Sequence, residues 1–503
     1  MPLLDQLAST LEARRQKGTL RRLTSFNPTT IATPKALLQA SSSSSSPSPS
    51  STIASTSTLA DFSSNDYLSI ATSSQLKEAF VRRVLRPEAR VGGSTGSRLL
   101  DGNNGGEIDE LEARLCDFFN ASSSLLCPSG WEANVSLFSS LPQEGDIVLY
   151  DSLIHASVHD GMRRSRAHCL SFEHNDLVDF EQILDGQVLP FLRETGGNLF
   201  LAVEALYSMD GDFSPLPELI AIAKQRDILV NGTGRFWVVV DEAHSCGCFG
   251  EAGQGMCQEW GVGAAADAAG EEDSVIRVAT FGKGFGVAGA AILCPPLIRQ
   301  YLINYARPLI FSTAQAHASL HLIHAALDVL QSPDGSRRRA RLAQNCELVR
   351  TTLQEALGRQ EDLPLVRAVC NAALEDSAAG IHEPPRPQRR RRRRPSPIIP
   401  LLTPHAHTRP LAAHLQAQGF LVRPITYPTV PRGRDRVRIC VHADNTAEEI
   451  RGLGRAVRDW VEGMRKREAG GSEIGEAGLK ARGGRDAELR LHRGTGGERT
   501  SRL

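Results

Sequence analysis

Six short apolar runs alternate with helical stretches between residues 61 and 313, and no other feature constrains the fold as much. The runs are SSLLCPS, DIVLYDS, NLFLAVEA, FWVVVDEA, VIRVATFG and GAAILCP. The helical stretches include residues 107–119 and 216–226. Strands that alternate with helices pair in a mostly parallel sheet, because each helix carries the chain back to the same edge. The sequence therefore predicts an α/β fold whose large domain spans residues 61–313.

The segments outside this domain follow other patterns. Residues 314–463 begin with a long helical pattern and end in RVRICVHAD, which predicts a smaller α+β domain. Residues 1–60 combine an amphipathic helical pattern, Leu3 to Leu23, with a serine-rich segment of low complexity that cannot form a core. An arginine-rich insertion lies near residues 384–396, and residues 464–503 are rich in Gly, Arg and Glu. We expect the insertion to be an exposed loop and the tail to be disordered.

Charge and composition argue against several classes of protein. The chain has 57 basic and 57 acidic residues, so no overall field draws it to nucleic acid; the run Arg389–Arg394 leaves nuclear targeting or RNA contact as alternatives. No apolar run approaches the roughly 18 residues of a membrane-spanning helix, and the first residues lack the apolar stretch of a signal peptide. We therefore expect neither a membrane protein nor a secreted one. Ten cysteines without a CxxC pair indicate free thiols in a reducing compartment and no metal site.

The run VVVDEAH places acids and a histidine directly after a buried strand. Val238 to Val240 are β-branched, so Asp241 should lie at the carboxyl end of a parallel strand, where open α/β sheets bind ligands. The letters DEAH also occur in helicases, whose acids hold magnesium. A helicase needs a phosphate loop that ends in Gly-Lys-Ser or Gly-Lys-Thr, and neither tripeptide occurs in the sequence. The helicase interpretation therefore fails.

Asp241 and Lys283 together suit the chemistry of pyridoxal phosphate (PLP). PLP enzymes need a lysine that holds the cofactor as a Schiff base and a carboxylate that keeps its pyridine nitrogen protonated. Lys283 follows an apolar strand in a glycine-rich context, where a desolvated amine has a lowered pKa. His244 is placed to bond the cofactor's phenolic oxygen and His155 to stack on its ring. In CPSGWEANVS, a strand leads through Gly130–Trp131 into a helix whose free N–H groups suit a phosphate.

Ten segments in a fixed order carry a resemblance to a known family. They are FSSNDYLSI, GSTGSRLLDG, LCPSGWEANVS, DSLIHASVHDGMRRS, FEHNDL, VEALYSMDGDFSPL, VDEAHSCGCFGEAGQG, ATFGKGFG, NYARPLIFSTA and YPTVPRGRDRVRI. On these motifs the chain resembles the α-oxoamine synthases, which are PLP-dependent enzymes of fold type I, and among them the 8-amino-7-oxononanoate synthases. The resemblance covers roughly residues 1–40 and 61–460. It implies a mostly parallel sheet in a large PLP-binding domain and a smaller α+β domain.

The resemblance implies a role for each matched residue. Lys283, Asp241 and His155 are the implied catalytic residues. The implied cofactor-binding residues are Gly130, Trp131, His155, Ser208, Asp241, His244, Thr280 and Lys283. Positions that contact substrate in the family are matched by Arg21, Asn65 and Thr429.

One substrate-binding position departs from the family pattern. The arginine that the family assigns to the amino-acid carboxylate is Thr426 in this chain. A substrate carboxylate in a dry site needs a cation, and a bidentate arginine is the best such partner. Arg423 lies three residues before Thr426 and is our candidate for this role; the alternative is that Arg423 is a surface residue.

The implied reaction is the decarboxylative condensation of L-alanine with pimeloyl-coenzyme A, which gives 8-amino-7-oxononanoate in biotin biosynthesis. The implied partners are these small molecules and a second copy of the chain, because family members are homodimers with the active site at the subunit interface. We expect no nucleic acid and no membrane partner. Two alternatives stay open: a relative that uses another amino acid or a longer acyl or polyketide thioester, and a nucleic-acid-binding protein on a retained PLP fold.

The last three residues predict a location in the cell. Ser501-Arg502-Leu503 resembles the Ser-Lys-Leu address that the peroxisomal import receptor reads. An acyl-coenzyme A substrate also belongs to the chain-shortening chemistry of peroxisomes. We expect the peroxisomal matrix, with the cytoplasm as the alternative, since Asp5 and Glu12 do not suit a mitochondrial transit peptide.

Overall fold

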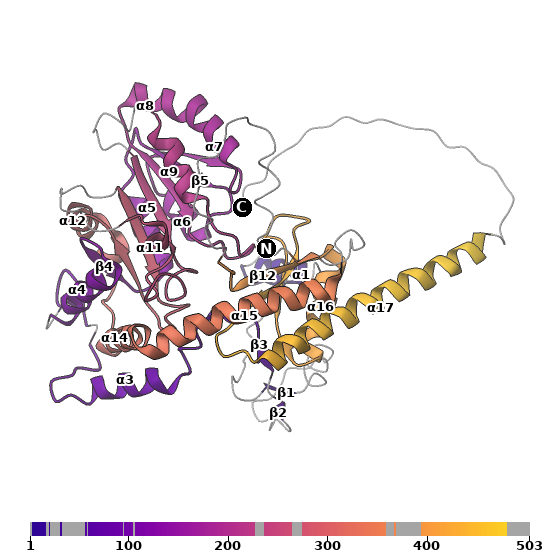
Figure 1. Cartoon of the computed structure of the whole chain (residues 1–503). Coiled ribbons are helices and arrows are strands. Elements are labelled where there is room, and N and C mark those ends of the chain that lie inside the picture. Colours follow the sequence, from indigo (N-terminus) through magenta and orange to yellow (C-terminus); the bar gives the residue numbers. More distant parts are fainter. Residues whose placement is uncertain are drawn as a thin grey trace, which may run out of the picture.

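The computed structural model describes most of the two expected domains. The described residues are 3–16, 20, 31–32, 56–57, 59–93, 95–103, 106–226, 236–263, 274–358, 367–368 and 394–479. Arg21, nearly all of the serine-rich segment, Arg389 to Arg393 and Ser501 to Leu503 lie outside them. The described part contains a large sheet and a smaller sheet, surrounded by helices (Figure 1). It also contains two short two-stranded ladders, β1 Ile31–Ala32 with β2 Thr56–Ser57 and β3 Ala60–Asp61 with β13 Phe420–Leu421.

Seven strands form the large sheet, in the order β4-β10-β9-β8-β7-β5-β6. Their bounds are β4 Ser124–Cys127, β5 Ile147–Asp151, β6 His168–Phe172, β7 Leu199–Glu204, β8 Phe236–Asp241, β9 Val275–Thr280 and β10 Ala290–Leu293. Strand β10 is antiparallel to both of its neighbours, and the pairs β9–β8, β8–β7, β7–β5 and β5–β6 are parallel. The predicted α/β class is confirmed, and all six apolar runs form strands. Strand β6 was not predicted, because only Phe172 of its residues is buried.

Alternate side chains of this sheet enter two separate cores. In β7, Leu199, Leu201 and Val203 belong to one core, whereas Phe200 and Ala202 belong to the other. The first core is completed by α4 Glu107–Phe119, α7 Leu177–Ile183, α8 Leu189–Thr195, α9 Leu216–Lys224 and α14 His317–Gln331. The second core is completed by α5 Gly130–Ser140, α6 Ala156–Met162 and α12 Pro296–Tyr305. Because both faces are covered, the strands read as continuous apolar runs.

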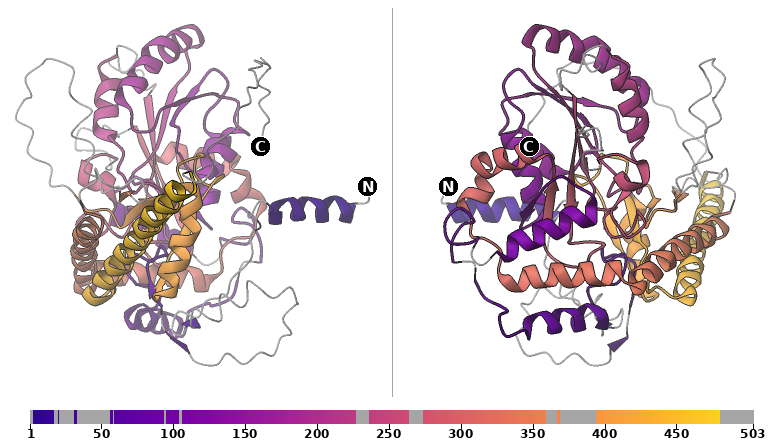
Figure 2. Two further views of the ribbon diagram at one scale, coloured as in Figure 1. Left: turned by 90° about the vertical axis from the view of Figure 1, so that its right-hand side faces the viewer. Right: turned by 60° about the vertical axis from the view of Figure 1, so that its left-hand side comes forward.

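A four-stranded antiparallel sheet and three helices form the smaller unit. The strand order is β11-β12-β15-β14, with β11 Arg367–Ala368, β12 Ile398–Leu402, β14 Arg423–Ile425 and β15 Arg436–Cys440. Helices α15 Pro333–Leu357 and α17 Ala447–Leu479 lie side by side, and α16 His405–Ala417 packs on the sheet and on α17 (Figures 1 and 2). The expected disordered tail from residue 464 is corrected in part, because α17 continues to Leu479.

Helix α1 Leu3–Gln16 has no buried residue, and Figure 2 shows it projecting from the body of the protein. The amphipathic pattern predicted a helix to Leu23, but the described helix ends at Gln16. Its leucines Leu3, Leu4, Leu7 and Leu11 are all exposed. None of the helices in the described ranges is both long enough and apolar enough to cross a membrane.

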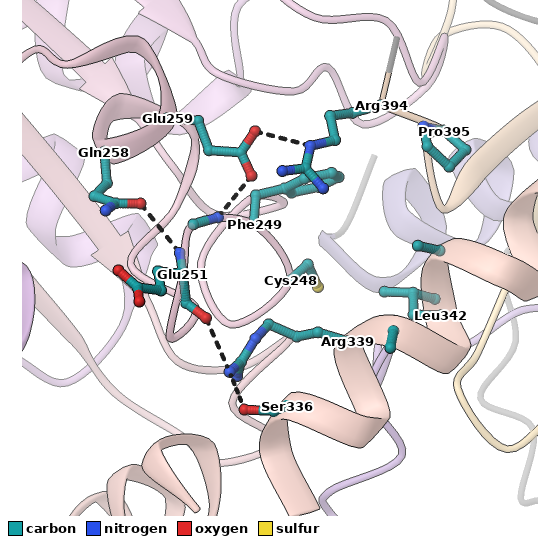
Figure 3. Close-up of a pocket in the computed structure, with 13 residues that line it drawn as sticks. Cys248, Phe249, Glu251, Gln258, Glu259, Ser336, Arg339, Leu342, Arg394 and Pro395 are labelled. Carbon is teal, nitrogen blue, oxygen red and sulfur yellow. Dashed lines mark hydrogen bonds and ion pairs between the residues drawn. The ribbon is translucent and has the colours of Figure 1, made fainter. Parts of the chain in front are cut away.

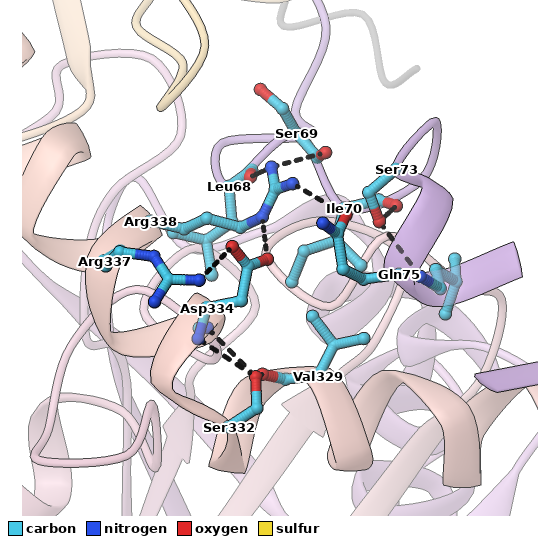
Figure 4. Close-up of polar contacts among 12 residues, drawn as sticks. Leu68, Ser69, Ile70, Ser73, Gln75, Val329, Ser332, Asp334, Arg337 and Arg338 are labelled. Atoms are coloured by element: carbon cyan, nitrogen blue, oxygen red, sulfur yellow. Dashed lines mark hydrogen bonds and ion pairs between the residues drawn. The ribbon is translucent and has the colours of Figure 1, made fainter. Parts of the chain in front are cut away.

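The two units meet along α15. Just beyond the large sheet, a cavity lies between α15 and the turn that follows β8 (Figure 3). On the same helix, Arg338 donates from Nη1 to the carbonyl oxygens of Leu68 and Ser69, at 3.0 Å each, and from Nε to Asp334 Oδ2 at 2.7 Å (Figure 4). Arg338 therefore fixes the segment between β3 Ala60–Asp61 and α3 Ser74–Val84 to the smaller unit.

Candidate active site

Three polar side chains end neighbouring strands of the large sheet. Asp241 is the last residue of β8, Thr280 the last of β9 and Glu204 the last of β7. Glu204 and Asp241 are partners in the parallel register, so their side chains leave the same edge of the sheet. Burial and the neighbouring charge of Asp241 raise the pKa of Glu204 well above its usual value. This edge is where the sequence placed the ligand site.

Asp241 is held by one residue of helix α5 and one of the turn that follows β8. Its Oδ2 accepts a hydrogen bond from Asn134 Nδ2 at 2.8 Å, and its Oδ1 accepts one from the backbone N–H of Ala243 at 2.9 Å. The other Asn134 Nδ2 proton goes to Ser157 Oγ at 3.0 Å. Ser157 Oγ therefore has its own proton left for His155 Nδ1, which lies 2.7 Å away. A continuous chain of hydrogen bonds thus runs from the Asp241 carboxylate through Asn134 and Ser157 to His155.

His155 is neutral in this arrangement. Its Nδ1 accepts hydrogen bonds from Ser157, and burial lowers the pKa of the ring, as does the charge of Lys283, against an opposing effect of Asp241. The remaining proton is then on Nε2. Trp131 lies edge-on to this ring, with the centroids 5.7 Å apart, and is 45% exposed.

His244 is hydrogen-bonded to Tyr67, which lies 177 positions away in the sequence. Its Nδ1 lies 2.6 Å from the hydroxyl of Tyr67, which is fully buried. Burial lowers the pKa of His244 well below its usual value, and the charge of Lys283 adds to the effect, so the ring is neutral. Burial also raises the pKa of Tyr67, so its hydroxyl keeps its proton and can donate it to Nδ1. His244 then carries its own proton on Nε2.

Asn65 connects this pair to the smaller sheet. Its Oδ1 lies 3.3 Å from the Tyr67 hydroxyl and accepts a hydrogen bond from Arg438 Nη2, also at 3.3 Å. Because Arg438 supplies a donor to Asn65, the single Tyr67 proton can stay with the closer acceptor, His244. Arg438 also donates from Nη1 to the carbonyl oxygen of Ser208 at 3.2 Å.

Lys283 lies in the turn between β9 and β10. Burial lowers the pKa of its amine; the carboxylates of Asp241 and Glu204 oppose this effect, and the cation of Arg438 adds to it. The lysine, the aspartate and the arginine are therefore within electrostatic reach of one another. A lowered pKa favours the neutral amine, which is the form that attacks an aldehyde.

Gly130 and Thr280 form a site that fits a phosphate. Gly130 is the first residue of α5, and a Cβ atom there would collide with the Thr280 hydroxyl. That hydroxyl oxygen is buried and has no hydrogen-bond partner among the described residues. A helix N-terminus with free N–H groups and a hydroxyl without a partner is a suitable environment for an anion. The residues present therefore fit PLP, with Lys283 for its aldehyde, Asp241 for its ring nitrogen and Gly130 with Thr280 for its phosphate.

The loop that carries Ser208 is held by two charged contacts. Arg436 Nη1 donates to Asp210 Oδ1 at 2.5 Å. His174 lies between Asp151, at 2.9 Å from Nδ1, and Asp212, at 2.8 Å from Nε2. Burial disfavours a charged His174, but the hydrogen bonds to both aspartates outweigh it and raise the pKa to about 10. A permanent cation thus joins the loop to the end of β5.

The structure does not gather every predicted residue into this cluster. Thr429 is exposed in the turn after β14, and the one hydrogen bond described for it runs from its N–H to the Thr426 carbonyl at 3.0 Å. Arg423 is the register partner of Arg438 on the neighbouring strand, and Asp61 is the charge that acts on it. Arg21 lies outside the described residues. Among the described residues, the interactions given above for Thr429 and Arg423 do not involve Lys283.

Four residues at the site were not predicted from the sequence: Asn134, Tyr67, Glu204 and Arg438. Each lies within a quoted motif, but none stands out by its own pattern. Arg438 had the clearest signal, because a strand buried on both faces rarely carries an arginine without a polar partner. Asn134 also had one, as an amide on an otherwise buried helical face.

Comparisons with known proteins agree with this geometry. The aminotransferase class I and II family model matches residues 57–457. The chain is 39% identical to an 8-amino-7-oxononanoate synthase of Emericella nidulans over 81% of this chain and 91% of that protein. It is 31% identical to the aminoacyl transferase sphA of Aspergillus fumigatus, over 82% and 83%. The solved structure of Sphingomonas wittichii serine palmitoyltransferase has a similar fold, with a TM-score of 0.68 at 21% identity, over 91% of this chain and 97% of that one. The chain therefore belongs to the aminotransferase class I and II family, as an α-oxoamine synthase-like acyltransferase.

Proposed function

We propose that this protein binds PLP through Lys283 and condenses L-alanine with pimeloyl-coenzyme A to give 8-amino-7-oxononanoate, as a step of biotin biosynthesis. The observation that carries the proposal is the meeting of Lys283, Asp241 and the Gly130–Thr280 anion site at one sheet edge. The similarity to an 8-amino-7-oxononanoate synthase supports the choice of substrates.

The cofactor, when bound, would supply an electron sink for the carbanion at the amino acid's α-carbon. Asp241 would keep the proton on the pyridine nitrogen, since both of its oxygens are already oriented by Asn134 and Ala243. His244, with Tyr67 on Nδ1, presents Nε2–H as a donor for the phenolic oxygen. His155 offers a neutral ring for stacking.

Lys283 Nζ would accept the α-proton of the amino acid, because burial lowers its pKa and so favours the neutral amine. A carbon–carbon bond then forms between the α-carbon and the thioester carbonyl carbon as the carbon–sulfur bond breaks, and coenzyme A leaves as the thiolate, which takes a proton from solvent. The carboxylate leaves as carbon dioxide, and the vacated position on the α-carbon takes up a proton; Lys283 would return the one it accepted.

Arg438 would hold the amino acid's carboxylate in place of the arginine that Thr426 replaces. Both hydrogen bonds described for its guanidinium run to neutral oxygens, at 3.2 and 3.3 Å, and its charge acts on Lys283. A carboxylate is a stronger partner than either oxygen. Arg438 therefore supersedes Arg423 as our candidate.

A second candidate is a condensation that uses another amino acid or a longer acyl or polyketide thioester. The similarity to an aminoacyl transferase favours it. Product analysis with a panel of amino acids and acyl thioesters separates the two candidates, because each pair gives an amino ketone of different mass.

The decisive experiment is a titration of the purified, PLP-loaded protein with L-alanine and pimeloyl-coenzyme A. We expect a visible absorbance band that changes on adding alanine, release of coenzyme A, and formation of 8-amino-7-oxononanoate. The Lys283→Ala variant should stay folded and lose turnover, because it lacks both the covalent anchor and the base. Near-normal turnover in that variant would contradict the PLP assignment.

The expected homodimer and the peroxisomal address belong to the same proposal. The exposed Leu3, Leu4, Leu7 and Leu11 of α1 give an apolar surface that supports association with a second copy. Sedimentation of the PLP-loaded protein would test it, and a monomer at micromolar concentration would argue against it.

A further inference from the structure

The cavity beside α15 has a volume of about 630 Å³ and is separate from the Gly130–Thr280 edge of the site. A cavity of this size is typical of small-molecule sites, which span roughly 300–1,000 Å³. One wall is the turn after β8, with Cys248, Phe249 and Gly250; the opposite wall is α15, with Arg339 and Leu342 (Figure 3).

Two arginines line the cavity, and their surroundings differ. Arg394 lies at the mouth, with a 55% exposed side chain, and donates from Nε to Glu259 Oε2 at 3.1 Å. The other Glu259 oxygen, Oε1, accepts the backbone N–H of Gly250 at 2.9 Å. The Glu259 carboxylate is thus fully engaged on its own side of the cavity, as Figure 3 shows.

Arg339 has no carboxylate partner in the part of the chain that the structure describes. Its guanidinium donates to three neutral oxygens: Leu330 O at 3.0 Å, Glu251 O at 3.2 Å and Ser336 Oγ at 3.2 Å. These bonds use three of its five N–H donors. Burial lowers the pKa of Arg339, and the neighbouring Cys248 does not offset this as an anion, since burial raises the pKa of its thiol and keeps it neutral. An anion in the cavity would offset the burial cost of this cation.

The rest of the lining is mixed: Ala340, Leu342 and Ala343 give an apolar stretch on α15, whereas Glu251, Gln258 and Ser336 are polar. Phe249 and Leu342 line it with the small exposed part of their side chains, 7% and 3%, and Ala340 and Ala343 complete the wall of α15. Burying an aliphatic tail here gains about 0.8 kcal/mol for each CH₂ group. We propose that this cavity is a binding site for a small aliphatic carboxylate, with the carboxyl group on Arg339 and the tail against Phe249 and Leu342.

This position places the ligand next to the loop that carries Lys283. A Cβ atom on Gly284 would lie 3.0 Å from Cys248 Sγ, and one on Gly247 would lie 2.7 Å from the carbonyl carbon of Gly284. The turn that forms the cavity wall therefore packs directly against Gly284, with no room for an extra carbon atom.

Isothermal titration calorimetry of the full chain tests the site, using octanoate, acetate and inorganic phosphate as probes. The measurement needs no turnover, so it does not depend on the proposed function. We expect octanoate to bind at least about tenfold more tightly than acetate, since even two of its additional CH₂ groups would suffice at about 0.8 kcal/mol each. Phosphate that binds as tightly as octanoate would overturn the proposal, because the cavity would then recognise charge alone.

Two variants and one control locate the binding. Arg339→Gln should weaken octanoate binding at least about tenfold. Ala340→Phe should do the same by filling the cavity, and it leaves the Arg339 hydrogen bonds in place in case the first variant is unstable. Arg337→Gln, on the exposed face of the same helix, should bind octanoate as the unchanged protein does. Octanoate binding that survives Ala340→Phe, or that pimeloyl-coenzyme A displaces competitively, would place the ligand elsewhere and refute the proposal.

Discussion

Replacing Arg438 by Gln should weaken binding of the amino-acid substrate. The side chain leaves β15 and reaches between Ser208 and Asn65, and its charge lowers the pKa of Lys283. Glutamine retains a donor for one of these oxygens but removes the cation. If Arg438 holds the substrate carboxylate, the loss falls on the Michaelis constant for the amino acid.

The expected size follows from the environment of Arg438. The residue is partly buried, so the pair is weaker than in a fully dry site and stronger than on the surface. Removing one partner of a hydrogen-bonded charge pair in such a setting costs about 2 kcal/mol. At about 1.4 kcal/mol per factor of ten, the KM for alanine should rise roughly 30-fold.

Steady-state kinetics with alanine varied at saturating pimeloyl-coenzyme A measures this effect. Arg423→Gln is the matched control, because Arg423 is the register partner of Arg438 on the same sheet and the charge that acts on it is Asp61. Arg438→Lys should lie between the two, since it keeps the charge and loses the fork. A KM for alanine within threefold of the unchanged enzyme in Arg438→Gln, or a larger rise in Arg423→Gln, would refute the assignment.

Four further changes test other parts of the structure. Thr280→Val removes a buried hydroxyl that has no described partner, so it should lower the affinity for PLP about tenfold in a cofactor titration while the melting temperature of the cofactor-free protein stays the same or rises. Tyr67→Phe takes the donor from His244 Nδ1 and should lower kcat about tenfold with an unchanged KM for the acyl thioester; equal kcat values would show that Tyr67 does not orient the histidine. His174 has a pKa of about 10 in the folded state, above its unfolded value, so its contribution to stability is complete below about pH 6.5 and is lost as the pH rises toward 10. The difference in unfolding free energy between the unchanged protein and His174→Gln should therefore shrink over that range in urea titrations, and a constant difference would contradict the charged clamp. For the address, a fluorescent protein fused to the amino terminus should give punctate peroxisomal signal that deletion of Ser501 to Leu503 makes diffuse; a diffuse signal from the full chain would defeat it.

The large sheet could be predicted from the sequence because its strands are buried on both faces. Because they are buried, runs such as Val238 to Val240 consist of apolar residues and are easily recognised. The polar residue after such a run, here Asp241, then indicates the edge of the sheet where a ligand binds. Strand β6 escaped notice for the opposite reason, since it is an edge strand with one buried residue. Helix α17 continues beyond residue 464, where we expected disorder to begin. A glycine-rich, charged composition lowers helix propensity but does not exclude a helix.

Some residues of the candidate active site could likewise be predicted from the sequence, and others could not. Asp241 ends one strand and Lys283 comes three positions after the end of the next, so local pattern and chemistry were enough to find them. Arg438 reaches Asn65 across 373 residues, and Tyr67 reaches His244 across 177, so neither contact has a signature in any short window of sequence. Arg423 was chosen because it is near Thr426 in the sequence. In the structure, the antiparallel register of β14 and β15 pairs Arg423 with Arg438, which the sequence does not reveal.

The long reach of the Arg438–Asn65 bond also bears on how the protein is made. The segment with Asn65 and Tyr67 is synthesised early. Its partners in the smaller sheet are synthesised near the end: Cys440 N–H donates to Phe62 O at 2.8 Å, and Ala443 N–H donates to Tyr67 O at 2.7 Å. Contacts of such separation form late, because the intervening chain must close first. Until then the nascent large sheet contains Asp241 and Lys283, but Arg438 is absent and the segment with Tyr67, which orients His244, is not yet fixed in place. Cofactor capture during translation should therefore wait for β15, and chains stalled before residue 436 should accumulate without PLP.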